Sequence, residues 1–241
     1  MVSVRLFFGC KSMAVKHLNN FEIESAFQTL VANKRVALVG PSRSIVDSGY
    51  GMDIEQFDLV VRMNHQWPID PAKAPDLGSR MDILYHCCNG DHPIKNLFDL
   101  GFLRTQFVCF EYEVGNESPQ MIEHCERSGI PSMEVTSVYQ SLEAKLKTPP
   151  NTGLAAITHL LGMGVAELAL FGITFYQEPY SPGYIGDGAN LRFWKSDSPP
   201  KHIWPHNLDV QFRYFCQLMK VENRLKIDER SLKVIRLQDI A

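Results

Sequence analysis

The chain has 241 residues, of which 45% are hydrophobic and 21% are charged, so it is long enough to bury a full core and shows no stretch typical of disorder. Its formal net charge of −3 excludes the strongly basic surface of most nucleic-acid-binding proteins. No run reaches the roughly 18 to 20 apolar residues of a membrane span, and MVSVRLFFGC lacks the cleavage site of a secretory signal, so we expect one soluble domain over residues 1–241 without an integral membrane segment.

The first central strand is predicted to lead into a polar turn. A helix is expected over residues 21–34, before the apolar run Val36–Val39, which is typical of a strand buried on both faces. Gly40 ends this run and lets the backbone approach a ligand closely, while Ser42 offers a hydroxyl group and Arg43 a positive charge. We therefore expect a phosphate-binding turn here.

A second apolar run, residues 57–61, predicts a parallel strand that delivers Arg62, Met63 and Asn64 to its carboxyl end. Ligands of open α/β sheets bind at such strand ends. A Rossmann oxidoreductase is the weaker alternative, because GPSRSI lacks the G-x-G-x-x-G pattern and Asn64 stands where such enzymes have an acidic residue.

The end of the next predicted strand, residues 81–85, carries residue types that can bind metals. His86, Cys87, Cys88 and His92 lie close together, but no second ligand pair follows at the spacing of a tetrahedral zinc site. We favour buried thiols at a strand end and predict no metal. The six cysteines of the chain lack paired spacing, which is typical of reduced thiols in a cytosolic protein.

The stretch TPPNTG predicts a helix N-terminus. Asn151 can cap a helix that runs to about Gly162, which places Thr152 and Gly153 in its first turn. The N–H groups and the dipole of such a turn favour an anion, although any well-capped helix offers the same features.

Residues 174–205 show no sustained period and are rich in Tyr, Pro, Gly and Trp. A loop of this length in a compact domain is usually a lid or a linker. Its aromatic residues favour a lid that stacks on a sugar or a base, namely Tyr176, Tyr180, Tyr184, Phe193 and Trp194.

The last predicted helix begins after a histidine. Asn207 can cap this helix, so His206 lies just before its N-terminus, where the dipole disfavours the imidazolium ion and leaves a base that accepts a proton. A histidine at a helix start more often has a structural role. The tail SLKVIRL, residues 231–237, alternates and predicts the last strand.

The stretch SGYGMDIEQFDLVVRMN, followed by DLGSRMDILYHC, resembles the long sialyl motif of the eukaryotic-type sialyltransferases. The resemblance implies that Asn64 holds the cytidine or ribose of a CMP-sugar. Pro41 stands where the family has asparagine in the turn after Gly40, so that nucleotide contact is either missing or supplied by Ser42.

Two later stretches resemble the other motifs of this family. PNTG and Phe171-Gly172-Ile173 resemble the short motif, which implies a CMP pocket lined by Asn151, Thr152, Gly153 and Gly172. His202-Ile203-Trp204 and HNLDVQ resemble the third and very short motifs, which implies that His206 is the catalytic base and His202 a phosphate partner. Gln211 stands where many members have glutamate.

The resemblance also implies a fold, namely a single α/β domain with a mostly parallel twisted sheet flanked by helices, a glycosyltransferase-A-like variant. The implied activity is inverting, metal-independent transfer of sialic acid, or of Kdo, from a CMP-sugar to a saccharide or glycolipid acceptor. The donor is a co-substrate, and no cofactor is expected. The chain contains no D-x-D pair, which agrees with this donor class.

The Golgi members join their long and short motifs by a disulfide, but Arg35 and the residues 148–150 stand at the two positions here. This departure implies a bacterial or viral relative that works in a reducing cytoplasm. A catalytically inactive CMP-sugar-binding module is the alternative function. Such a module would keep Asn64 and Thr152 without needing His206.

Overall fold

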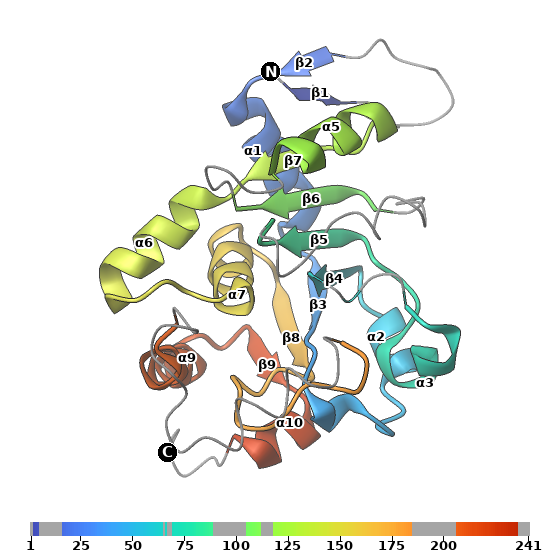
Figure 1. Ribbon diagram of the computed structural model, residues 1–241, viewed down its shortest axis with the longest axis vertical. Coiled ribbons are helices and arrows are strands. Elements are labelled where there is room, and N and C mark those ends of the chain that lie inside the picture. The colour runs from blue at the N-terminus through green and yellow to red at the C-terminus, as the bar shows by residue number, and fades with distance from the viewer. Residues whose placement is uncertain are drawn as a thin grey trace.

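The computed structural model describes residues 2–4, 16–64, 66, 69–88, 105–111, 118–184 and 206–235. Its centre is a seven-stranded sheet in the order β7-β6-β5-β4-β3-β8-β9, in which each neighbouring pair is parallel. Helices flank this sheet (Figure 1). The structure therefore confirms the predicted α/β fold class.

The strands of the large sheet are β3 (Arg35–Val39), β4 (Leu59–Met63), β5 (Ile83–His86), β6 (Phe107–Phe110), β7 (Ser132–Glu134), β8 (Glu167–Phe171) and β9 (Leu225–Ile227). The described helices are α1 (Asn20–Val31), α2 (Gly51–Glu55), α3 (Ala74–Leu77), α5 (Ser118–Ser128), α6 (Thr136–Leu146), α7 (Thr152–Gly162), α9 (Leu208–Val221) and α10 (Glu229–Val234). Two 3₁₀ turns, η1 (Arg43–Ile45) and η2 (Pro71–Lys73), and a small antiparallel pair, β1 (Val2–Val4) and β2 (Lys16–Leu18), complete the described elements.

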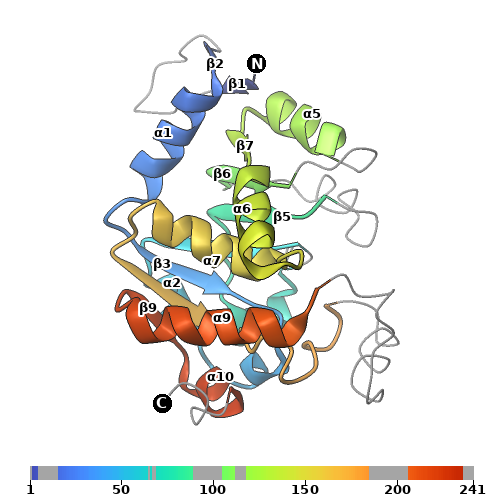
Figure 2. The ribbon, with the colours of Figure 1, turned by 90° about the vertical axis from the view of Figure 1, so that its left-hand side faces the viewer.

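Helices pack on both faces of the sheet. Figure 1 shows α6, α7 and α9 on one side and α2 and α3 on the other, and in Figure 2 the first three lie in front of the sheet. The largest buried cluster joins Val36 and Leu38 to residues of α1, α6, α7 and α9. Ala37 and Val39 belong to a second cluster on the opposite face. The strand β3 is thus buried on both faces, as its continuous apolar run predicts.

The strand order reverses beside β3. The chain runs from β3 through β4, β5 and β6 to β7 on one side, and then adds β8 and β9 on the other side of β3. The carboxyl ends of β3 and β8 therefore flank the topological switch point, where open α/β sheets bind their ligands.

The strand β4 begins at Leu59, two residues later than the sequence predicts, because α2 is followed by a turn in which Phe57 N donates to Ile54 O. Arg62 therefore lies inside the strand instead of beyond its end. Its side chain is 0% exposed and points to the face opposite to Met63, where Nε donates to Arg80 O (2.7 Å) and Nη2 to Leu77 O (2.7 Å). The expectation that Arg62 reaches the ligand edge is wrong.

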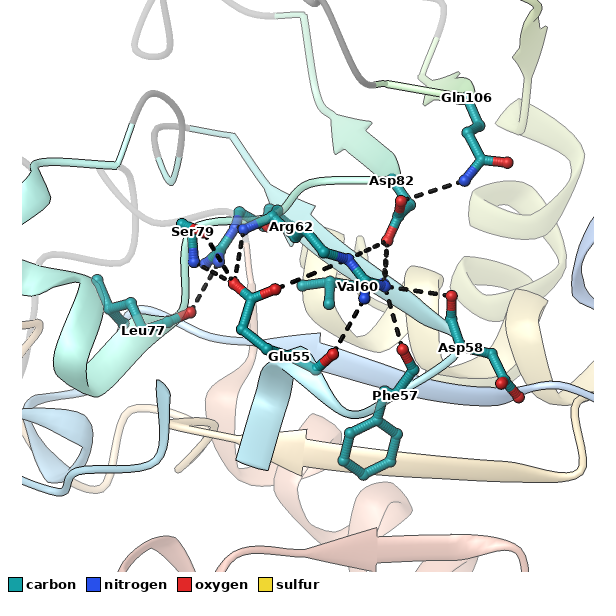
Figure 3. A network of polar contacts seen from close by, with 10 residues as sticks. Glu55, Phe57, Asp58, Val60, Arg62, Leu77, Ser79, Asp82 and Gln106 are labelled. Atoms are coloured by element: carbon teal, nitrogen blue, oxygen red, sulfur yellow. Dashed lines mark hydrogen bonds and ion pairs between the residues drawn. The ribbon is translucent and has the colours of Figure 1, made fainter. Parts of the chain in front are cut away.

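Arg62 belongs to a polar network near the amino-terminal ends of β4 and β5 (Figure 3). Arg80 Nη2 lies 2.8 Å from Asp82 Oδ2, and the Glu55 carboxylate accepts from Arg80 N (3.0 Å). Asp82 also accepts from Val60 N (2.8 Å). Burial lowers the pKa of Arg62 to about 10, although Glu55 and Asp82 oppose this shift. The network joins α2, β4 and the start of β5, so this part of the long motif supports the scaffold.

The predicted C-terminal strand is also wrong. Ser231 begins the apolar alternation of the tail, but residues 229–234 form the helix α10, and β9 is the last strand among the described residues. The physical reason is the N-cap, because the Asp228 side chain accepts from Ser231 N (2.9 Å) and fixes a helix start. Ser231 and Ile235, four residues apart, are then both buried.

Five cysteines lie in the described part of the chain, and all of them are buried without a disulfide bond: Cys87, Cys88, Cys109, Cys125 and Cys216. Across the same described residues, no helix has the length and apolar character needed to span a bilayer.

Candidate functional site

Gly40 and Gly172 meet at the switch point. Gly40 N donates to Phe171 O (2.6 Å), and a Cβ atom at Gly40 would lie 2.3 Å from Ile173 Cγ1 and 2.4 Å from Gly172 O. Gly172 has a φ of 64° and donates its N–H to Asp228 Oδ2 (2.9 Å). The close approach that Gly40 permits is thus to the neighbouring strand end, and the nucleotide contacts of both glycines stay predictions.

The turn after β3, which the sequence predicts to bind phosphate, uses its N–H groups within the chain. Ser42 N donates to Gly172 O (2.9 Å), Arg43 N to Pro179 O (2.9 Å) and Ser44 N to Glu178 Oε1 (2.6 Å). The Ser42 side chain is 4% exposed, and its hydroxyl group contacts the same Glu178 carboxylate. A carboxylate of the chain therefore occupies the position expected for an anion.

Glu178 belongs to residues 174–184, the described part of the predicted lid, which we call the strap. Ser181 N donates to Pro41 O (2.7 Å), and Lys73 Nζ of η2 donates to the neighbouring Pro182 O (2.7 Å), so this part of the strap is held against both the turn and η2. The remainder of the predicted lid, with Phe193 and Trp194, lies outside the described residues.

The three tyrosines of the strap contact one another. The ring centroids of Tyr176 and Tyr180 are 5.9 Å apart, and those of Tyr180 and Tyr184 are 5.0 Å apart. Burial raises the pKa of Tyr176 to about 12, and the nearby Cys87 also raises it, which places this ring towards the end of β5. Their predicted stacking on a sugar or base stays a prediction.

Asn64 connects three elements at the carboxyl ends of the parallel strands. It follows β4 directly with a φ of 48°, a conformation that asparagine tolerates better than most residues. Its Nδ2 donates to Thr152 Oγ1 (3.4 Å) at the start of α7, and its Oδ1 accepts from Cys87 N (3.0 Å) after β5. The structure therefore brings together Asn64 and Thr152, which are 88 residues apart in sequence.

The start of α7 matches the predicted helix N-terminus. The Asn151 side chain accepts from Leu154 N (2.8 Å) and caps the helix. Among the described residues, none accepts a hydrogen bond from Thr152 N or Gly153 N. A Cβ atom at Gly153 would lie 3.2 Å from Asn151 Oδ1 and 3.6 Å from Met63 Sδ, so these side chains lie close to the first turn and the glycine adds no further side chain there. These N–H groups can bind an anion.

His206 is held beside this helix start. Its Nδ1 lies 2.8 Å from Pro149 O, and since a carbonyl oxygen only accepts, Nδ1 carries the proton. Burial lowers the pKa of His206, although the hydrogen bond to Pro149 opposes the shift. The neutral imidazole therefore has its lone pair on Nε2, as a general base requires. His202 lies outside the described residues.

The segment between α6 and α7 also binds the start of α9. Asn207 caps α9 through Val210 N (3.2 Å), as predicted, and its own N–H donates to Thr148 Oγ1 (2.9 Å). His206 directly precedes the start of α9, and Thr152 begins α7. Residues 148–151 thus connect the starts of these two helices.

Sequence reasoning missed a buried tyrosine at this place. A hydrogen bond with Thr152 connects Tyr139 of α6 to the start of α7. Burial raises the pKa of Tyr139 well above its usual value, and the nearby Glu111 raises it further. Its spacing within an amphipathic helix gives no signal that separates it from core residues.

The metal-binding residue types after β5 have other partners. His86 is buried, and its Nδ1 accepts from Cys88 N (3.0 Å). The described residues contain no group of three or more His, Cys, Asp or Glu side chains that could hold a metal ion. His92 lies outside the described part of the chain.

The fold is similar to that of solved sialyltransferases. A mammalian sialyltransferase in complex with Gal-β-1,3-GalNAc-ortho-nitrophenol has a TM-score of 0.56 and 16% identity, over 84% of this chain and 71% of that chain. The sialyltransferase CstII from Campylobacter jejuni, in complex with the substrate analogue CMP, has a TM-score of 0.51 and 14% identity, over 81% and 79% of the two chains. At these identities the comparison establishes the shared fold. No protein-family model matches the sequence, and no curated protein is a significant match.

Proposed function

We propose that the chain is an inverting glycosyltransferase that moves sialic acid, or Kdo, from a CMP-sugar to the hydroxyl group of a saccharide or glycolipid. One observation carries this proposal. A partly buried histidine with its lone pair on Nε2 is joined through Pro149 to a helix N-terminus whose first two N–H groups have no acceptor among the described residues, in a fold shared with sialyltransferases. A base beside an anion site is the arrangement that transfer from a sugar phosphate needs.

The start of α7 is the proposed phosphate site. Thr152 N and Gly153 N point from the positive end of the helix dipole, and Asn151 holds the turn in place. Asn64, which bonds to Thr152, is proposed to bind the cytidine or ribose. Gly40, Ser42 and Gly172 are assigned a supporting role for the nucleotide, because the Glu178 carboxylate already fills the turn after β3.

In the proposed reaction, His206 Nε2 removes the proton from the acceptor hydroxyl group, whose oxygen attacks the anomeric carbon of the sugar. The bond from that carbon to the phosphate oxygen breaks, and CMP leaves with the electron pair. The N–H groups at the start of α7, together with His202, stabilise the negative charge of the departing phosphate. A single displacement inverts the anomeric carbon, and no metal or cofactor takes part.

The test is release of free CMP. The protein is incubated separately with CMP-sialic acid and with CMP-Kdo, with and without a galactoside acceptor. We expect release from at least one donor, and faster release with the acceptor present. Absence of release from both donors would refute the proposed transferase.

A CMP-sugar-binding module without activity is the second candidate. The observation that favours it is the filled turn after β3, where Pro41 replaces the asparagine of the family and Glu178 takes the N–H of Ser44. Binding of CMP without turnover of either donor would support this module.

The five buried cysteines without disulfides support a further proposal, namely that the protein works in a reducing cytoplasm and is a bacterial or viral relative of the family.

A further inference from the structure

The side chain of Gln211, on the first turns of α9, is 0% exposed and makes two hydrogen bonds to the segment before α7. Its Oε1 accepts from Asn151 N (2.9 Å), and its Nε2 donates to Pro149 O (3.1 Å). One amide group therefore satisfies a donor and an acceptor of the buried main chain, two residues apart.

Pro149 O is also the acceptor for His206 Nδ1 (2.8 Å). The position of the His206 ring therefore depends on the orientation of the Pro149 carbonyl group. Gln211 donates to the same carbonyl group, and it fixes Asn151, the cap residue of α7, through the same side chain. The two ends of the Gln211 amide thus connect the histidine to the start of α7.

We propose that Gln211 is a positioning residue that holds His206 at a fixed distance from the start of α7. This inference rests on the proposed function for its effect on turnover, but its effect on the His206 ring does not depend on that function. Gln211 acts through Pro149 and is not itself a catalytic residue.

The chemistry of the side chain explains why an amide suits this position. A glutamate carboxylate can accept from Asn151 N, but it has no hydrogen to donate to Pro149 O. A methionine has a similar length and makes neither hydrogen bond. Gln211→Glu therefore removes the hydrogen bond to Pro149 O, and Gln211→Met removes both hydrogen bonds.

The experiment compares these two variants with Gln217→Met, a matched control on the exposed face of the same helix. Turnover and CMP affinity are measured on folded protein, well below its unfolding temperature. The ¹⁵N shifts of the His206 imidazole are recorded in parallel, with a His206→Ala spectrum to assign them. A role confined to stability would change neither the turnover of the folded protein nor the shifts.

We expect the Gln211→Met variant to lose roughly 10- to 100-fold in kcat, the effect of a displaced base, with less change in CMP affinity because the Asn151 side chain still caps α7. The wild-type ¹⁵N shifts should show a protonated Nδ1 and an unprotonated Nε2, and this pattern should be lost or averaged in Gln211→Met and kept in Gln217→Met. If Gln211→Met does not fold, Gln211→Glu should show the same two changes.

Unchanged kcat, or unchanged His206 shifts, in a folded Gln211 variant would overturn the inference. If the wild type turns over neither CMP-sialic acid nor CMP-Kdo, the proposed function fails. The ¹⁵N shifts then decide the positioning role alone.

Discussion

At the residue scale, Asn64 combines a structural and a proposed binding role. Its Oδ1 accepts from Cys87 N, and its Nδ2 donates to Thr152 Oγ1. Asn64→Asp keeps the acceptor for Cys87 but loses the donor and adds a negative charge near the proposed phosphate site. We expect CMP affinity to fall by about tenfold or more, or about 1.4 kcal/mol, in a calorimetric titration.

The matched control is Asn33→Asp. Asn33 also has a positive φ (60°), and it is exposed at the end of α1. This variant should bind CMP like the wild type. Unaltered CMP affinity in Asn64→Asp would remove Asn64 from the nucleotide site.

The second residue-scale prediction concerns pH. Burial lowers the pKa of His206 below the ordinary histidine value of about 6.5. Because a base must be unprotonated, kcat/KM for the donor should stay level down to about pH 6.5 and fall only at lower pH. A falling limb centred above that value, measured with saturating acceptor, would show that the reacting base is not this neutral histidine.

Single residues at the sheet edge could be predicted only in part. The pattern R-M-N located Asn64, whose place after β4 follows from the strand itself. It misplaced Arg62, because the strand lies two residues later than predicted, so that Arg62 falls inside the strand with a buried side chain. The contacts of Gln211 depend on two elements that meet only in the fold, so no local pattern reveals them.

At the element scale, two candidate anion sites can be told apart, namely the turn after β3, which Glu178 of the strap occupies, and the start of α7. In Glu178→Ala, Ser44 N and the Ser42 hydroxyl group lose the carboxylate that they contact. We expect the free energy of unfolding to fall by about 1 to 3 kcal/mol in urea titrations. CMP affinity should stay within about twofold, because the phosphate is proposed to bind at α7.

Glu126→Ala, an exposed glutamate on α5, is the control and should alter the free energy of unfolding by less than about 0.5 kcal/mol. A clear gain in CMP affinity in Glu178→Ala would contradict the assignment, since it would mean that the carboxylate competes with the phosphate at the turn after β3.

The packing of α7 on the sheet predicts a pH-dependent stability. His159 is buried on α7, stacks on Phe27 with centroids 5.1 Å apart, and pairs with the Tyr85 hydroxyl group (2.8 Å). Burial lowers the pKa of His159 to about 4. The unfolded chain therefore binds a proton more readily, so this stabilisation is complete above about pH 6.5 and is lost as the pH falls towards 4.

As the pH falls from about 6.5 towards 4, the contribution of His159 to the free energy of unfolding should fall by up to about 3 kcal/mol. Urea unfolding at several pH values measures the loss. In His159→Leu the same interval should show a smaller slope. Equal slopes in the two proteins would show that His159 is not the group responsible.

Elements with strong end signals were predicted well. The caps Asn151 and Asn207 located α7 and α9, because a capping side chain acts within its own turn. The tail was predicted as a strand from the alternation of SLKVIRL, because that prediction did not take the Asp228 cap into account. The strap could not be foreseen, since Glu178 and Ser42 are 136 residues apart.

At the scale of the whole molecule, the order of motifs along the chain predicts where they meet. Parallel strands place their carboxyl ends at one edge, so Gly40, Asn64 and Gly172 had to lie along that edge. The sequence also predicted the fold class, which the sheet and the similar sialyltransferases confirm. The position of α9 against the segment before α7 required the structure.

The central claim is that His206 acts as the base in transfer from a CMP-sugar. The most direct test is acceptor-dependent CMP release by the wild type and by His206→Ala, with His124→Ala on α5 as the control and CMP affinity measured by calorimetry. We predict release by the wild type from CMP-sialic acid or CMP-Kdo, and a loss of roughly 10² to 10⁴ in kcat with nearly unchanged CMP affinity in His206→Ala. Equal kcat in the wild type and His206→Ala, or a wild type that binds CMP and releases none from either donor, would contradict the claim.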